Sequence, residues 1–239
     1  MNPKHPKPKL SQRELTVAWQ TASLVLDYPQ EELLRQLPLL ASACDTLSRE
    51  VGGPLRRTVD HLGRTPLAES ARQYVETFDN RKRCCLFLTY FVHGDTRKRG
   101  VALLRFKQAF RKAGLELTEA ELPDHLCVLL EFGATANHLD AWGLLLDHRA
   151  GLELLRIALR DQESPWAGAV EAVTATLPPL RGDEMDAVRR LAAQGPPDEE
   201  VGLAPYGGAE LLPPHDSIAA PSGAASAMAG AMTSTGGLR

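Results

Sequence analysis

Apolar residues at helical spacing fill most of the first 194 residues of the chain. Between Ser11 and Tyr28, Leu15, Trp19 and Leu26 share one face of a predicted helix that Ser11 can cap. The same spacing predicts further helices over residues 30–47, 55–63, 66–78, 97–113, 122–132, 139–160 (one or two), 165–177 and 183–193. No segment alternates convincingly between apolar and polar residues. The pattern therefore predicts an all-α fold, a single helical-bundle domain of eight to ten helices.

Prolines and glycines mark the expected interruptions of these helices. Pro38 is expected to kink or break the helix over residues 30–47. The sequence Gly52-Gly53-Pro54 is expected to form a loop, and Gly94 and Gly114 are expected to end helices.

Residues 84–92, CCLFLTYFV, are apolar in almost every direction. A helix with no polar face is buried on all sides, so this segment is predicted to be the central rod of the bundle. A buried strand is the alternative, because short apolar runs do not distinguish helix from strand. The helical neighbours favour the helix.

Composition divides the chain into three parts. Residues 1–9 carry three lysines between three prolines, which predicts a disordered basic leader and not a signal peptide. Residues 10–194 form the predicted helical domain. Residues 195–239 are rich in Pro, Gly, Ala and Ser and are predicted to be a flexible tail. Within that tail, residues 203–206 are an alternative candidate for a short docking motif.

Charge and aromatic residues are both concentrated between Tyr74 and Gly114. Seven of the 13 aromatic residues lie there, which marks the centre of a core. Residues 80–112 contain ten Lys or Arg and one acid, whereas residues 115–153 contain eight acids and one Arg. Segments of opposite sign predict helices with complementary surfaces. The alternative is a helical nucleic-acid-binding regulator that uses the basic face of residues 81–112.

The sequence contains no recognisable catalytic or metal-binding motif. The four cysteines include neighbours, Cys84 and Cys85, which point to different faces of a helix and are expected to be structural thiols. Phosphate-binding loops and nucleophile motifs are missing, and no apolar run reaches the length of a membrane span. These features predict a cytoplasmic protein that is not an enzyme and has no cofactor or metal.

One further constellation, Pro123-Asp124-His125, admits two interpretations. Asp124 could simply cap the helix that follows, with His125 facing solvent. Alternatively, the acidic surroundings and nearby apolar residues suit a groove that binds a basic amphipathic helix.

Three motifs in order resemble the nitrate reductase molybdenum cofactor assembly chaperones, the NarJ or delta-subunit family. They are YVETFD at residues 74–79, HGDTRKRG at 93–100, and ELPDHL at 121–126 followed by LEF at 130–132. The resemblance covers roughly residues 12–178. Thr77 replaces a bulkier apolar residue of the family, and His93-Gly-Asp-Thr replaces the commoner His-Gly-Glu-Ser.

The resemblance implies an all-helical chaperone that holds no cofactor of its own. Such proteins bind the N-terminal segment of the catalytic subunit in the cytoplasm until molybdenum cofactor and iron–sulfur cluster are inserted and the membrane partner is ready. By resemblance, the client-binding residues are Tyr74, Phe78, Pro123, Asp124 and His125. The expected partner is the catalytic (alpha) subunit of nitrate reductase, with neither nucleic acid nor stable membrane insertion.

Overall fold

The computed structural model describes residues 5–94, 96–117 and 122–194, which confirm the predicted all-α fold. These residues form eleven α-helices and no strand: α1 Gln12–Leu26, α2 Glu31–Asp45, α3 Arg49–Arg64, α4 Leu67–Tyr74, α5 Tyr90–His93, α6 Arg97–Lys112, α7 Leu126–Thr135, α8 His138–Asp147, α9 Arg149–Asp161, α10 Ala167–Thr176 and α11 Gly182–Gln194. A π-helical turn, η1 Val75–Asp79, continues α4, and η2 Lys82–Cys84 is a 3₁₀ turn. None of the described helices is long and apolar enough to cross a membrane.

Residues 1–199 form one compact unit, and residues 200–239 are a separate unit that lies outside the described residues. The predicted flexible tail, residues 195–239, and its candidate docking motif also lie outside them. The three-part division of the chain therefore stays a prediction. Residues 5–9, which the sequence assigns to a basic leader, contact α8: Trp142 Nε1 donates to the Pro6 carbonyl at 2.9 Å.

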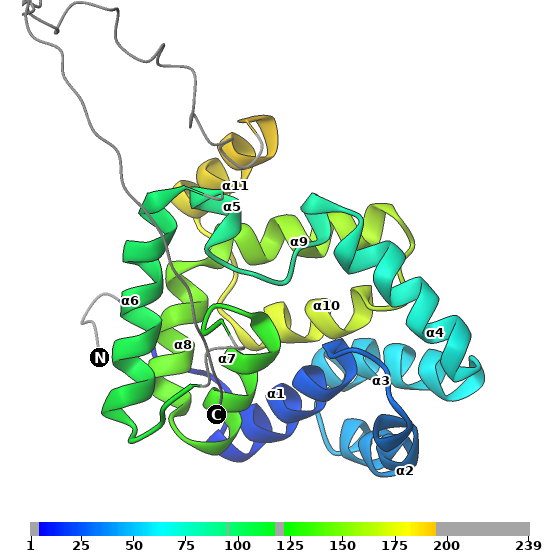
Figure 1. Ribbon diagram of the computed structural model, residues 1–239. Helices are drawn as coiled ribbons and strands as arrows, with labels where there is room; N and C mark the ends of the chain where they lie inside the picture. The colour runs from blue at the N-terminus through cyan, green and yellow to red at the C-terminus, as the bar shows by residue number, and fades with distance from the viewer. Residues whose placement is uncertain (1–4, 95, 118–121, 195–239) are drawn as a thin grey trace, which may run out of the picture. The chain divides into compact units, whose positions relative to one another are not determined.

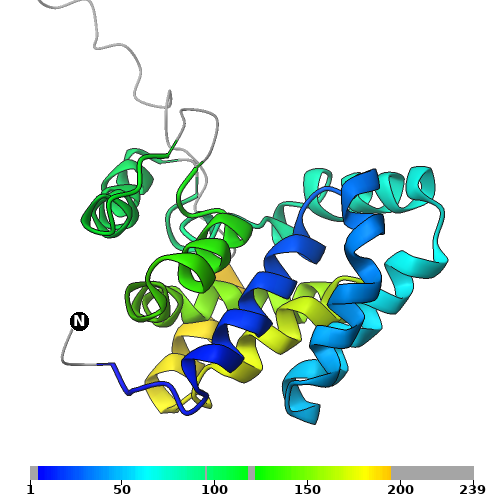
Figure 2. The same cartoon turned by 90° about the horizontal axis from the view of Figure 1, so that it is seen from below.

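Helix α1 is the central element of the first unit. It lies between α7 and α8 on one side and α2, α3 and α10 on the other (Figures 1 and 2). Ser11 caps its first turn, as the sequence predicts, and the Glu14 side chain caps the Ser11 backbone in return. Its core residues are fully buried, and two tryptophans fasten α10 to it. Trp19 Nε1 donates to Thr176 Oγ1 at 3.1 Å, and Trp166 Nε1 donates to the Val25 carbonyl at 3.0 Å.

The predicted loop at Gly52-Gly53-Pro54 is wrong, because these residues lie inside α3. Tertiary packing outweighs their low helix propensity. A side chain at residue 52 would meet the Cys44 carbonyl at 2.2 Å, and one at Gly168 of α10 would meet the Pro54 carbonyl at 2.2 Å. The two glycines therefore let α3 approach α2 and α10 closely.

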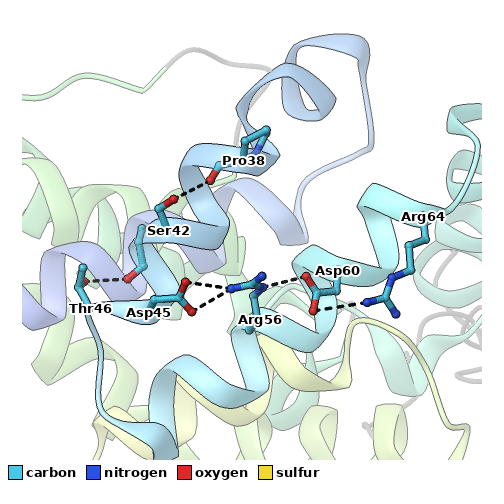
Figure 3. Close-up of polar contacts among 8 residues, drawn as sticks. Pro38, Ser42, Asp45, Thr46, Arg56, Asp60 and Arg64 are labelled. Atoms are coloured by element: carbon cyan, nitrogen blue, oxygen red, sulfur yellow. Dashed lines mark hydrogen bonds and ion pairs between the residues drawn. The ribbon is translucent and has the colours of Figure 1, made fainter.

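The helix over residues 31–45 continues through Pro38 without a break. Ser42 lies one turn after Pro38, and its Oγ donates a hydrogen bond to the Pro38 carbonyl at 3.0 Å (Figure 3). Arg56 of α3 then joins the two helices, because its guanidinium binds Asp45 of α2 and Asp60 of α3, both at 2.8 Å (Figure 3).

The predicted central rod over residues 84–92 is also wrong. Only residues 90–93 form an α-helix, and Phe87 instead makes an isolated antiparallel bridge with His125. The segment is nevertheless buried at Cys84, Leu86, Leu88 and Phe91. Its apolar composition thus reflects burial of an irregular segment, because apolar residues mark burial whatever the backbone conformation.

Acidic residues of α8 pair with basic residues of α6, as the opposite charges of the two segments predict. Arg105 binds Asp147 at 2.7 Å, and Lys112 binds Asp140 at 3.5 Å. His5 reaches the other oxygen of Asp147 at 3.1 Å. The segment near the N-terminus and α6 therefore meet at one carboxylate of α8.

Candidate functional site

A groove of about 350 Å³ opens between α1 and α7. We call it the α1–α7 groove. Its apolar lining comprises Leu24 of α1, Val128 of α7, and Phe87 and Leu122 from the segments that precede α5 and α7. Its polar lining comprises Gln20, Ser23, Asp27, His125, Cys127 and Glu131.

Close packing of α1 on α7 fixes the base of this groove. Ser23 Oγ donates to the Cys127 carbonyl at 2.9 Å. Further along, Gly133 leaves room for Trp19, since a Cβ at residue 133 would lie 2.6 Å from the indole ring. The two walls are therefore rigid helices in contact at their base, and a preformed site of this kind costs little ordering on binding.

The rim of the groove carries negative charge. The side chains of Asp27, at the end of α1, and Glu131, on α7, are both exposed. Burial raises the pKa of the Cys127 thiol well above its usual range, and the charges of Asp27 and Glu131 raise it further. The thiol thus stays neutral and weakly nucleophilic. The groove offers apolar surface and carboxylates, a combination suited to binding a cationic amphipathic segment.

Asp124 does not line the groove and is fully buried, as is its partner Thr89. Its Oδ2 accepts from Thr89 Oγ1 at 2.5 Å and from the Thr89 amide at 3.3 Å, and it lies 3.5 Å from the Arg99 guanidinium. The prediction that Asp124 caps α7 is wrong, because His125 occupies the N-cap position. The Asp124 carboxylate instead joins the turn before α7 to the segment before α5.

His125 is the predicted site residue that lines the groove. Its backbone pairs with Phe87, flanked by bonds from Leu88 N to the Asp124 carbonyl at 3.0 Å and from Leu126 N to the Leu86 carbonyl at 2.8 Å. The imidazole packs edge-on against the Phe87 ring, with centroids 5.0 Å apart. The buried Pro123 precedes it in the same turn. The bridge thus fixes His125 and Phe87 as one wall.

Tyr74 and Phe78 lie in the core and do not line the α1–α7 groove. Their rings pack on each other and on Trp166, with centroids 4.6 to 5.6 Å apart. Tyr74 Oη donates to the Leu26 carbonyl at 3.1 Å, and burial raises the pKa of this phenol. Both residues therefore support the end of α1, where Asp27 begins the rim.

The structure adds groove residues to which the sequence analysis assigns no role in a site, among them Leu24, Asp27, Val128 and Glu131. They lie at i, i+3 positions on α1 and α7, so each pair presents one apolar and one acidic side chain on the same helix face. One residue in the sequence could have indicated this groove: Leu24 is apolar but lies outside the apolar stripe assigned to the first predicted helix.

Among the described residues, no group of three or more His, Cys, Asp or Glu side chains could hold a metal ion.

Comparison with known proteins gives consistent matches. Residues 44–172 match the family described as the nitrate reductase delta subunit. The nitrate reductase-like protein NarX of Mycobacterium tuberculosis (strain ATCC 25618 / H37Rv) is 39% identical over 164 residues, which are 67% of this chain and 24% of that protein. The chain thus spans about a quarter of the length of this relative.

Two shorter relatives are covered more fully. The probable nitrate reductase molybdenum cofactor assembly chaperone NarJ of Bacillus subtilis (strain 168) is 31% identical over 166 residues, which are 67% of this chain and 88% of that protein. The nitrate reductase molybdenum cofactor assembly chaperone NarJ of Escherichia coli (strain K12) is 31% identical over 152 residues, which are 61% of this chain and 63% of that protein.

Proposed function

Since the chain belongs to the nitrate reductase delta subunit family, we propose that it is an assembly chaperone for a respiratory nitrate reductase and not an enzyme. In this proposal it binds the N-terminal segment of the apo catalytic subunit in the cytoplasm. It holds that subunit while molybdenum cofactor and iron–sulfur cluster are inserted, before the enzyme assembles at the membrane. Two relatives whose names state molybdenum cofactor assembly support this function.

The α1–α7 groove is the proposed client-binding site. The observation that carries this assignment is the combination of an apolar lining with two exposed carboxylates, Asp27 and Glu131, at the rim. An amphipathic helix with basic residues along one edge matches both features, because its apolar face can be buried while its cations approach the carboxylates.

Within this proposal the five residues identified by resemblance have different roles. His125 contacts the client directly, because its ring lies in the groove wall. Pro123 and Asp124 hold the turn that presents His125. Tyr74 and Phe78 support the end of α1 from the core side. A change at any of the four supporting residues would therefore alter binding through the position of the groove walls.

The expected affinity is moderate. Burying two or three large apolar side chains contributes about 1.5–3 kcal/mol each. Ordering a flexible peptide subtracts about 2–5 kcal/mol. At the favourable ends of these ranges, with about 1 kcal/mol from the rim charges, the net is about 8 kcal/mol. This corresponds to a dissociation constant in the micromolar range, which is strong enough to hold a client and weak enough to release it.

Titration calorimetry with a peptide of about 20 residues from the N-terminus of the cognate catalytic subunit tests the proposal, since one long helix has that length. Leu122→Ser is expected to weaken binding by roughly ten-fold, because it removes an apolar contact. Glu131→Gln is expected to weaken it by roughly two- to five-fold and to reduce its dependence on salt.

Matched controls lie outside the groove. Leu39→Ser changes a leucine of α2 that is 72% exposed, against 38% for Leu122, and Glu50→Gln removes a carboxylate from the first turn of α3. Both controls are expected to bind the peptide as the unmodified chain does. No heat at high micromolar concentration of the folded chain would refute the chaperone proposal. Equal losses of peptide affinity in Leu122→Ser and Leu39→Ser would show that the client does not bind in the α1–α7 groove.

A further inference from the structure

Helix α6 presents a wide outer face that no described helix covers. It lies at the edge of the first unit (Figures 1 and 2), and only Phe106 and Phe110 of its side chains are fully buried. The helix contains seven Lys or Arg residues and no acid. It is therefore a cationic helix held to the fold along one narrow stripe.

Four of these cations make no ion pair within the described part of the chain: Arg97, Lys98, Lys107 and Arg111. The α8 carboxylates neutralise Arg105 and Lys112 only. The charge complementarity between α6 and α8 thus accounts for part of the positive charge and leaves the rest facing solvent. The chain as a whole has a net charge of −3, so this positive charge is local to one face.

Two apolar side chains occupy the centre of the same face. Val101 is 68% exposed and Leu104 is 53% exposed, and their spacing places them next to each other on the helix surface. At 100° per residue, Lys107 and Arg111 flank them on one side, whereas Lys98, Arg105 and Lys112 flank them on the other. An exposed apolar strip between two basic edges is typical of helices that lie in the interface of a membrane.

The shape of this face favours a bilayer over other polyanions. A single protruding helix is convex and cannot enclose a peptide. Duplex nucleic acid is bound mainly by polar contacts to phosphates, which leave exposed Val101 and Leu104 unexplained. A bilayer of anionic lipids supplies phosphates for the edges and acyl chains for the centre.

From these observations we infer that the outer face of α6, defined by Arg97, Lys98, Val101, Leu104, Lys107 and Arg111, binds peripherally to anionic membrane surfaces. The helix lies parallel to the bilayer, with Val101 and Leu104 inserted at the level of the headgroups and the cations in contact with lipid phosphates. Binding of this kind is reversible and does not span the membrane. It is also independent of the α1–α7 groove, which is built from other elements.

Vesicle flotation with the full chain tests this inference. Vesicles containing equal parts of phosphatidylglycerol and phosphatidylcholine are compared with pure phosphatidylcholine, at 0.1 M and 0.5 M salt. The chain is expected to bind only the anionic vesicles, and less at high salt, because screening shortens the range of the charges. Replacing Arg97, Lys107 and Arg111 by Gln is expected to lower partitioning by roughly a hundred-fold, at about five-fold for each cation.

Two further variants make the test specific. Replacing Arg13, Arg49 and Arg160 by Gln changes the net charge equally at exposed sites on α1, α3 and α9 and is expected to leave partitioning within about three-fold. Val101→Gln with Leu104→Gln keeps every charge but is expected to weaken vesicle binding by roughly ten-fold, because the apolar insertion is lost. Circular dichroism checks that each variant is folded.

Three results would overturn the inference. One is an absence of binding to anionic vesicles by the unmodified, folded chain. Another is an equal loss of partitioning in the α6 and control charge variants. The third is binding to a DNA duplex, measured by fluorescence anisotropy, that depends on the α6 cations while vesicles are not bound, which would assign the face to nucleic acid.

Discussion

Asp124 is one of the residues identified by resemblance, and its observed contacts stabilise the fold. Its carboxylate is fully buried and accepts two hydrogen bonds from Thr89, with Arg99 at 3.5 Å. Asp124→Ala would leave the Thr89 hydroxyl and amide without this acceptor and Arg99 without this charge. We expect a loss of about 3 kcal/mol in the free energy of unfolding, measured by urea denaturation.

Asp124→Asn separates this structural role from a direct role in client binding. The amide oxygen of Asn can still accept from Thr89, so the loss of stability should be about 1–2 kcal/mol. Peptide affinity should then fall only as far as the turn before α7 is disturbed. A stable Asn variant that binds no peptide would instead place the Asp124 carboxylate in contact with the client.

His148 makes the stability of the fold dependent on pH. Burial against Phe106 lowers the pKa of the imidazole below its ordinary value of 6.5, despite a hydrogen bond to the Leu144 carbonyl and the nearby Asp147 carboxylate. Below pH 6.5 the unfolded chain therefore binds a proton that the folded chain does not. Stability is retained above pH 6.5 and falls as the pH drops through 6.5 towards the lower folded-state pKa.

Urea denaturation at pH 7.5 and pH 5.5 measures this contribution. The unmodified chain should lose up to about 1.4 kcal/mol more than His148→Asn over that interval, because Asn does not titrate. Other groups titrate equally in both proteins and cancel in the difference. Parallel losses in the two proteins would show that His148 does not cause the effect.

At the residue scale, the sequence identifies the turn Pro123-Asp124-His125 but not the roles of its members. The helix predicted over residues 122–132 begins four residues later, at Leu126, so the three residues form the turn before α7 and His125 is its N-cap. Whether a carboxylate faces a groove or a buried threonine depends on the segment around residues 86–89, which is distant in sequence. Spacing along one helix contains no information about such a partner.

At the scale of elements, replacing glycine should have opposite effects at Gly53 in α3 and at Gly168 in α10. A side chain at Gly53 would have no neighbour within 4 Å, whereas one at Gly168 would meet the Pro54 carbonyl at 2.2 Å. Gly53→Ala should therefore stabilise the fold by about 0.5–1 kcal/mol through helix propensity. Gly168→Ala should destabilise it by about 2–4 kcal/mol, because α10 must move away from α3.

Thermal unfolding of both variants provides the measurement, and each serves as the control for the other. The same chemical change, a single methyl group in a helix, should shift the two midpoints in opposite directions. If Gly53→Ala is destabilised instead, residue 53 requires glycine, as the loop predicted from the sequence would. That result would contradict the place of Gly53 inside α3.

Sequence periodicity predicts the regular helices well and fails where tertiary contacts decide the backbone. The capping box of α1 and the positive φ angles of Gly94 and Gly114 follow from local chemistry. Residues 84–92 differ because their backbone bonds to the turn before α7, as in the bond from Leu88 N to the Asp124 carbonyl. A buried irregular segment and a buried helix have the same apolar composition, so the sequence alone did not separate them.

At the scale of the whole molecule, two surfaces differ in charge and in shape. The α1–α7 groove is concave with exposed carboxylates, whereas the outer face of α6 is convex and cationic. A basic client segment and an anionic bilayer would therefore be directed to different parts of the first unit. The sequence predicts the opposite charges of neighbouring segments but not which of them remain unpaired, because that depends on the packing of α6 against α8.

Client binding should also raise the stability of the whole fold, since a ligand that binds only the folded state stabilises it by mass action. At a peptide concentration 100 times the dissociation constant, the gain is about 2.7 kcal/mol. For a unit of this size, that corresponds to a rise of roughly 5–10 °C in the midpoint of thermal unfolding. The shift is measured by differential scanning fluorimetry with the cognate peptide and with a peptide of the same composition in scrambled order.

The variants then locate the effect. At a fixed peptide concentration, Leu122→Ser should lose about half of the shift, because a ten-fold weaker affinity removes about 1.4 kcal/mol of the linkage. Leu39→Ser should retain the shift. Equal shifts with the scrambled peptide would show that composition is sufficient and that the groove does not recognise an amphipathic face. A shift that only the cognate sequence produces, and that depends on Leu122, requires the order of apolar and basic residues to match the groove.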